Sequence, residues 1–172
     1  MAQERTGQYT LKGNALTLEG PELKAGDPAP AFSALKGLNQ IFESKEIEGK
    51  LRFINVVPSV DTGICDAQTK RFSEEANKIK DIEWITISCD TPMALSRWCS
   101  AGSITNLRML SDFKDHSFGL AYGVYVKELG LLQRAIIIIG SDNKVKYFQR
   151  VAEMATHPNY DEALSELKKV LG

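Results

Sequence analysis

The stretch between residues 51 and 101 constrains the fold most, because strand patterns alternate there with helical patterns. Residues 51–57 (LRFINVV) are mostly apolar and end at Pro58, which is typical of a buried strand. Residues 64–79 carry apolar side chains at helical spacing, residues 83–88 alternate as a second strand, and residues 92–101 have helical spacing again. Strand, helix, strand, helix is the pattern of a parallel sheet with helical crossovers.

The segments before this stretch predict a hairpin and a loop. Residues 9–12 and 15–18 are β-prone and are separated by Gly13-Asn14, a dipeptide typical of a two-residue turn. We therefore expect an N-terminal β-hairpin within residues 1–19. Residues 20–31 are rich in Pro and Gly, which predicts an extended loop leading into the main fold.

The segments after it complete an α/β pattern. We expect a short segment at 107–110, a short helix at 116–122, strands at 134–139 and 144–151 joined by a turn at 140–143, and a final helix at 160–171. This order predicts a single thioredoxin-like domain over residues 1–172. Its central mixed sheet is flanked by helices, and the N-terminal hairpin is added to it.

Charge and hydropathy exclude several classes of partner. The 172 residues carry a net charge of −1, and neither sign forms a long run, which argues against nucleic acid and anionic membrane as partners. The longest strongly apolar run, residues 135–139, is too short to span a bilayer, and the first residues lack the apolar core of a signal peptide. We expect a soluble, cytoplasmic protein.

The chain has three cysteines, Cys65, Cys89 and Cys99. A disulfide framework needs more cysteines and usually an even number of them. The three are better interpreted as buried apolar residues, metal ligands or redox catalysts. Metal is the weakest of these, because the chain has no C-x-x-C and its two histidines, His116 and His157, lie far apart in sequence. No pattern indicates a haem, flavin or other cofactor.

Cys65 is the strongest candidate for a catalytic residue because of its position in the predicted fold. It follows the strand at 51–57 and falls in the first turn of the next helix, where free backbone N–H groups and the helix dipole favour negative charge. A cysteine that attacks peroxide must be ionised near neutral pH, whereas an ordinary thiol has a pKa of about 8.5. Taken alone, such a cysteine is more often a small buried apolar residue.

The residues around Cys65 carry a family resemblance. The segment from Pro58 to Cys65, PSVDTGIC, resembles the P-x-x-x-T-x-x-C motif of peroxiredoxins. Within that family the chain is similar to the thiol peroxidase subgroup along almost its whole length. The sequence segments that carry this similarity are Gly13-Asn14, Leu18-Glu19-Gly20, Gly26-Asp27-Pro28-Ala29-Pro30, residues 55–62 and Ser96-Arg97-Trp98-Cys99.

The resemblance implies a role for each matching residue. Cys65 would attack the peroxide and become a sulfenic acid. Pro58 would shield the thiolate, and Thr62 would hydrogen-bond the thiolate and the peroxide. Arg134, which leads into the strand at 134–139, would be the fixed cation of the site.

Cys99 matches the resolving cysteine of the subgroup and would form an intramolecular disulfide with Cys65. The resemblance further implies hydrogen peroxide and organic hydroperoxides as substrates, thioredoxin as reductant and a homodimer. Cys89 is interpreted as structural, with a back-up resolving role as the alternative.

Two other functions remain open from the sequence. A peroxide sensor would use the same thiol chemistry to relay oxidation to a client protein. A thioredoxin-like binding module would not use the thiol chemistry of Cys65.

Overall fold

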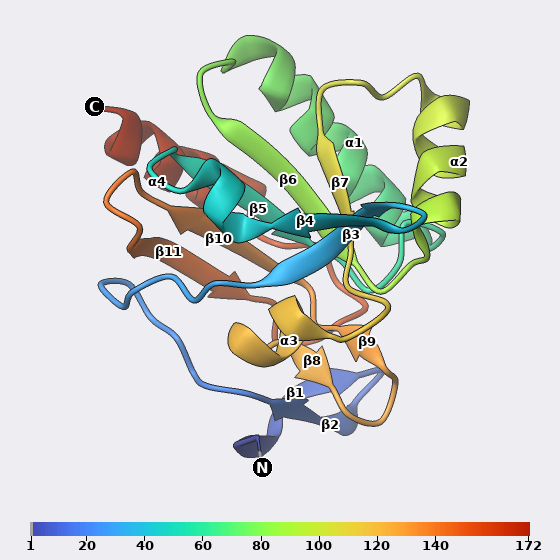
Figure 1. Ribbon diagram of the computed structural model, residues 1–172. Coiled ribbons are helices and arrows are strands. Elements are labelled where there is room, and N and C mark those ends of the chain that lie inside the picture. The colour runs from blue at the N-terminus through green and yellow to red at the C-terminus, as the bar shows by residue number, and fades with distance from the viewer. Residues whose placement is uncertain (1) are drawn as a thin grey trace.

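A mixed sheet of seven strands lies at the centre of the computed structural model, which describes residues 2–172 (Figure 1). Its strands are β3 (Ser33–Gly37), β4 (Gln40–Glu43), β5 (Arg52–Val56), β6 (Glu83–Ser88), β7 (Arg108–Ser111), β10 (Ala135–Ile139) and β11 (Val145–Arg150). The strand order is β11-β10-β5-β6-β7-β3-β4. β5, β6 and β7 are parallel, and the remaining pairs are antiparallel. The sheet is therefore mixed, as the sequence predicts.

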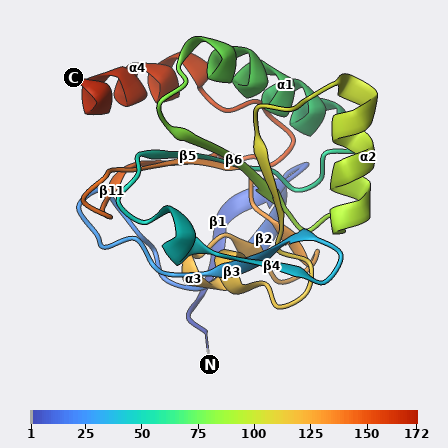
Figure 2. The same cartoon turned by 45° about the horizontal axis from the view of Figure 1, so that its top comes forward.

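Two long helices cover one face of this sheet. Figure 2 shows α1 (Gly63–Lys78) and α4 (Tyr160–Leu171) lying over β5 and β6. Phe72 of α1 packs against Phe53 and Trp84 of the sheet, with ring centroids 4.7 Å and 6.4 Å away. Burying a large apolar side chain contributes about 1.5–3 kcal/mol, so this cluster anchors α1 and thereby its first turn.

The opposite face is covered by the short helix α3 (Ser117–Ala121) and by the loop that precedes β3. The rings of Phe32 and Phe118 meet edge to face at 5.0 Å, and Tyr122 donates a hydrogen bond to the carbonyl of Pro30 at 2.9 Å. The helix α2 (Pro92–Gly102) packs beside β7 and β3, near the edge of the sheet. The loop before β3 is extended, as its Pro and Gly content predicts.

Within the described residues, the N-terminal hairpin forms a second sheet of four strands rather than a free appendage. The strands are β1 (Glu4–Leu11), β2 (Asn14–Glu19), β8 (Tyr125–Val126) and β9 (Leu131–Leu132). The predicted turn at Gly13-Asn14 is wrong by one residue. Leu11 pairs with Asn14, and the turn residues are Lys12 and Gly13, whose φ values of 49° and 80° are both positive, as a type I′ turn requires.

Most predicted elements lie close to their expected bounds. α1 spans residues 63–78 against the predicted 64–79, and β6 and α4 have the predicted bounds. The segment at 107–110 is strand β7, shifted by one residue. The sequence did not predict β3, β4, β8, β9 or the 3-10 turn at Ser44–Ile47, which are short and form through pairing with distant segments. None of the helices among residues 2–172 is long and apolar enough to cross a bilayer.

Candidate active site

Cys65 lies where the central strand β5 passes into helix α1. Thr62 is the N-cap of α1, and the first helical hydrogen bond runs from the Asp66 amide to the Thr62 carbonyl at 2.9 Å. Cys65 is the third residue of the helix, and its side chain is fully buried. The amides of this first turn and the positive end of the helix dipole therefore favour negative charge beside the sulfur, as predicted.

Arg134 contacts the sulfur of Cys65 directly. It immediately precedes β10, and because Ala135 pairs with Val56, the register brings Arg134 to the end of β5. Its Nη1 lies 3.4 Å from Cys65 Sγ, and its Nε donates to the carbonyl of Met154 at 3.0 Å. The guanidinium is buried, so its charge acts on the sulfur with little screening by water.

Gln68 is a residue of this site that the sequence interpretation missed. Its Oε1 accepts a hydrogen bond from Arg134 Nη1 at 2.9 Å, and its Nε2 donates to Asn55 Oδ1 at 2.5 Å. Asn55 in turn donates to the hydroxyls of Thr69 and Thr86, both at 3.1 Å. Gln68 lies one helical turn after Cys65, so a polar residue at that spacing from the cysteine is the signal that could have found it.

Pro58 and Thr62 lie in the turn between β5 and α1 that leads to Cys65. Pro58 is buried, whereas Thr62 is exposed. Thr62 holds the N-cap position, but its hydroxyl makes no cap bond and donates instead to the carbonyl of Ser59 at 3.2 Å. The hydroxyl is thus neither a helix cap nor a partner of the Cys65 sulfur in this structure.

An apolar pocket opens beside these residues. It has a volume of about 500 Å³. Its walls include Pro58, Thr62, Ile64 and Arg134 from the motif region, together with Leu11, Lys12, Gly63, Leu129, Leu131, Met154 and Ala155. The N-terminal hairpin and the β8–β9 connection therefore contribute one wall of the pocket, although they lie far from Cys65 in sequence.

Cys99 lies in the C-terminal half of α2 and is a free thiol, as are Cys65 and Cys89. It packs at the edge of the same apolar cluster that contains Cys65 and Trp98. Burial raises the pKa of Cys99. Trp98 Nε1 donates to Asp66 Oδ1 at 2.8 Å, so α2 is tied to the first turns of α1 in the reduced state.

Cys89 lies apart from this cluster. It follows β6 and packs against the core on the α3 side, whereas Cys65 belongs to the cluster between α1 and α2. Burial is the main cause that raises the pKa of Cys89 to about 12. A partly buried, protonated thiol on the other side of the sheet fits the structural interpretation better than a resolving role.

Comparison with known proteins gives the class of the protein. The profile of the redoxin family, described as "Redoxin", matches residues 24–164. A crystal structure described as a peroxiredoxin-like protein from Aquifex aeolicus superposes with a TM-score of 0.86 at 35% identity, over 96% of this chain and 99% of that chain. The chain therefore belongs to the redoxin family.

Thiol peroxidases match nearly the whole chain. The thiol peroxidase of Bacillus subtilis is 44% identical over 164 residues, 95% of this chain and 98% of that protein. The thiol peroxidase of Halalkalibacterium halodurans is 44% identical over 162 residues, 94% of this chain and 98% of that protein. The resemblance predicted from the motif at Cys65 is confirmed, and it places the chain in the thiol peroxidase group of the peroxiredoxins.

Proposed function

We propose that this chain reduces hydroperoxides with Cys65 as the attacking thiolate. The observation that carries the proposal is the contact of 3.4 Å between Arg134 Nη1 and Cys65 Sγ at the first turn of α1. A guanidinium and a helix N-terminus both stabilise a negative sulfur, and both lie beside the apolar pocket. The similarity to thiol peroxidases supports the same reaction.

The first step is attack of the Cys65 thiolate on one peroxide oxygen. An S–O bond forms as the O–O bond breaks, so Cys65 becomes a sulfenic acid and the substrate leaves as an alcohol, or as water from hydrogen peroxide, after taking up a proton. Arg134 stabilises the developing charge on the leaving oxygen. Thr62 lines the pocket, and rotation of its hydroxyl away from Ser59 would let it bond the peroxide.

The second step is resolution by Cys99. Its sulfur attacks the sulfenic sulfur of Cys65, a disulfide forms, and water leaves. A disulfide requires Cα atoms about 4.4–6.8 Å apart and a specific orientation of both sulfurs. Cys65 and Cys99 are held within two separate helices. We expect the first turn of α1 and the part of α2 around Cys99 to unwind locally on oxidation.

The disulfide is recycled by an external dithiol protein. Thioredoxin, with a potential of about −270 mV, transfers two electrons to such a disulfide and is the reductant we propose. We also propose that the chain acts as a single domain, works in the cytoplasm and pairs with a second copy of itself. No metal or organic cofactor is needed for the reaction.

The apolar pocket supports organic hydroperoxides as substrates beside hydrogen peroxide. Its walls are mostly aliphatic, so an alkyl chain would be buried there while the peroxide group reaches Arg134. Leu131→Asp places a charge in this wall. The expected result is a fall in kcat/KM for cumene hydroperoxide of about 10-fold or more, with a smaller change for hydrogen peroxide. Equal losses for both substrates would contradict this role of the pocket.

Peroxide-dependent oxidation of thioredoxin tests the whole proposal. Wild type should turn over in steady state, and Cys65→Ser should be inactive. Cys99→Ser should also lose turnover, but a sulfenic acid should persist on Cys65 and be trapped by dimedone. Arg134→Met should slow the reaction by about 100-fold or more, whereas Arg71→Met on the exposed side of α1 should not. A single oxidation without turnover would instead favour the peroxide sensor.

A further inference from the structure

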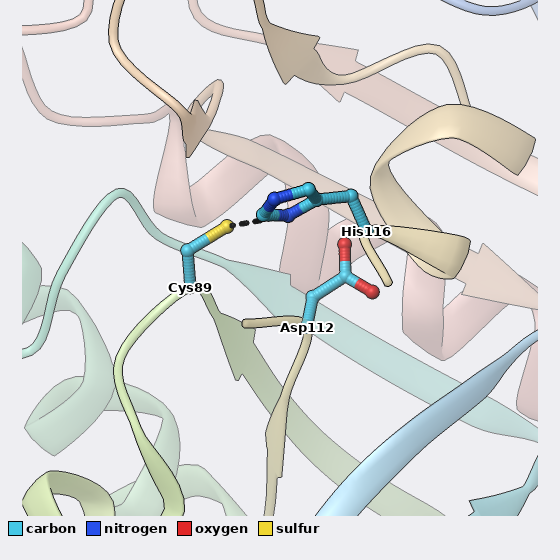
Figure 3. A group of neighbouring side chains, drawn as sticks. All are labelled: Cys89, Asp112 and His116. Atoms are coloured by element: carbon cyan, nitrogen blue, oxygen red, sulfur yellow. Dashed lines mark hydrogen bonds between the residues drawn. The ribbon is translucent and has the colours of Figure 1, made fainter. Parts of the chain in front are cut away.

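A second group of side chains with metal-ligand atoms lies on the α3 side of the sheet (Figure 3). Cys89 follows β6, Asp112 follows β7, and His116 precedes α3. The ligand atoms of the three lie within 4.8 Å of one another, and Cys89 Sγ is 3.7 Å from His116 Nδ1. None of the three has a part in the peroxidase reaction proposed above.

The surrounding backbone holds this group in place. The carboxylate of Asp112 accepts hydrogen bonds from the amides of Phe118 at 2.9 Å and Gly119 at 2.8 Å. The amide of His116 donates to the carbonyl of Asp112 at 3.2 Å, which closes the turn between them. The imidazole packs against the ring of Tyr125 with the centroids 4.6 Å apart and the planes tilted by 33°. Outer contacts of this kind orient metal ligands in proteins.

The separation of the sulfur and the imidazole nitrogen agrees with tetrahedral coordination. Zn–S bonds of about 2.3 Å and Zn–N bonds of about 2.0–2.1 Å place the sulfur and nitrogen about 3.6 Å apart in a tetrahedral site. The observed separation of Cys89 Sγ and His116 Nδ1 is 3.7 Å. A carboxylate oxygen of Asp112 lies within 4.8 Å of both atoms, close enough for a third ligand.

The local charge also favours a cation. Asp90 adds negative charge beside Cys89, and Asp115 adds it beside Asp112. Cys89 and His116 are only partly buried, so an ion and a water molecule can reach the group from solvent. Thiolate, imidazole and carboxylate together are a ligand set suited to a borderline-soft ion such as Zn²⁺.

We propose that Cys89, Asp112 and His116 bind one Zn²⁺ ion, with water in the fourth position. Binding releases the thiol proton of Cys89 to solvent, and no electron is transferred. The ion joins the ends of β6 and β7 to the start of α3. The sequence did not predict this site because Cys89 and His116 are 27 positions apart and form no ligand motif.

Titration with Co²⁺ tests the site, because a cobalt–thiolate bond has a near-ultraviolet charge-transfer band. The tag-free chain with Cys65→Ser and Cys99→Ser retains Cys89 as its single thiol. We expect the band to saturate at one equivalent and Zn²⁺ to displace the cobalt. Adding Cys89→Ser should abolish the band, and adding His116→Asn should weaken binding by about 100-fold or more.

The controls separate a specific site from loss of folding. His116 has φ of 52°, a conformation that Asn tolerates, so His116→Asn should keep the metal-free circular dichroism spectrum. His157→Asn, at the other histidine of the chain, should leave Co²⁺ binding unchanged. In the wild-type chain, Zn²⁺ should protect Cys89 from alkylation as measured by peptide mass mapping. Absence of the charge-transfer band, or equal alkylation of Cys89 with and without Zn²⁺, would overturn the proposal.

Discussion

Gln68 offers a sharp test of how the fold holds Arg134 beside Cys65. Gln68→Leu keeps a side chain of similar size but removes the acceptor for Arg134 Nη1 and the donor to Asn55 Oδ1. All three residues are buried, so water cannot replace the lost partners. A buried polar group without a partner costs about 1–3 kcal/mol, and a charged group costs more.

The expected loss for Gln68→Leu is therefore about 3–5 kcal/mol in the free energy of unfolding. For a domain of this size it corresponds to a fall in Tm of roughly 10 °C. The guanidinium loses one of its fixed contacts, so we also expect peroxide reduction to slow by about 10-fold to 100-fold. Urea unfolding and the thioredoxin-coupled assay measure the two effects separately.

Two matched variants complete the test. Gln68→Glu keeps an acceptor for Arg134 and disturbs mainly the contact with Asn55, so it should lose less stability than Gln68→Leu. Gln40→Leu, at an exposed position of β4, should change stability by less than about 0.5 kcal/mol. If Gln68→Leu unfolds at the same urea concentration as the wild type, the buried polar chain does not support Arg134 and the reasoning is wrong.

Three further predictions concern the surroundings of the site. Gly63→Pro should raise the free energy of unfolding, measured by urea unfolding, by about 0.4–1 kcal/mol. Gly63 is the first residue of α1 and Thr62 before it is extended, which is the backbone that a proline at this position requires. A loss of stability would contradict this. Hydrogen bonds, chiefly from Thr10, lower the pKa of Glu153 to about 2, so its contribution to stability is present above about pH 4 and is lost as the pH falls toward 2. Glu153→Gln should flatten that part of an acid-unfolding profile, and an unchanged profile would refute the link. Trp98→Phe removes the bond to Asp66 and should speed Cys65–Cys99 disulfide formation in quenched-flow mass spectrometry, whereas an equal rate would show that this bond does not restrain α2.

Local patterns predicted the framework of the fold well. The bounds of β6 and α4 agree with the sequence pattern, and the helix that carries Cys65 is shifted by one residue. These elements are long and strongly periodic, so their sequence determines their type. β8 and β9 have two residues each, and such short strands exist because they pair with β2 and with each other.

The sequence by itself determined the motif that makes Cys65 the candidate nucleophile, because the spacing from Pro58 to Cys65 is a local property of the chain. Only the tertiary structure decided which distant groups meet Cys65. The family resemblance named Arg134, but it is the antiparallel register of β10 on β5 that brings its side chain to the sulfur. Gln68 bonds the guanidinium, and Asn55 in turn bonds Gln68. The same holds for Cys89, Asp112 and His116, which converge because parallel strands β6 and β7 end at one edge of the sheet. Contacts between segments far apart in sequence depend on strand register and packing, and no local pattern encodes them.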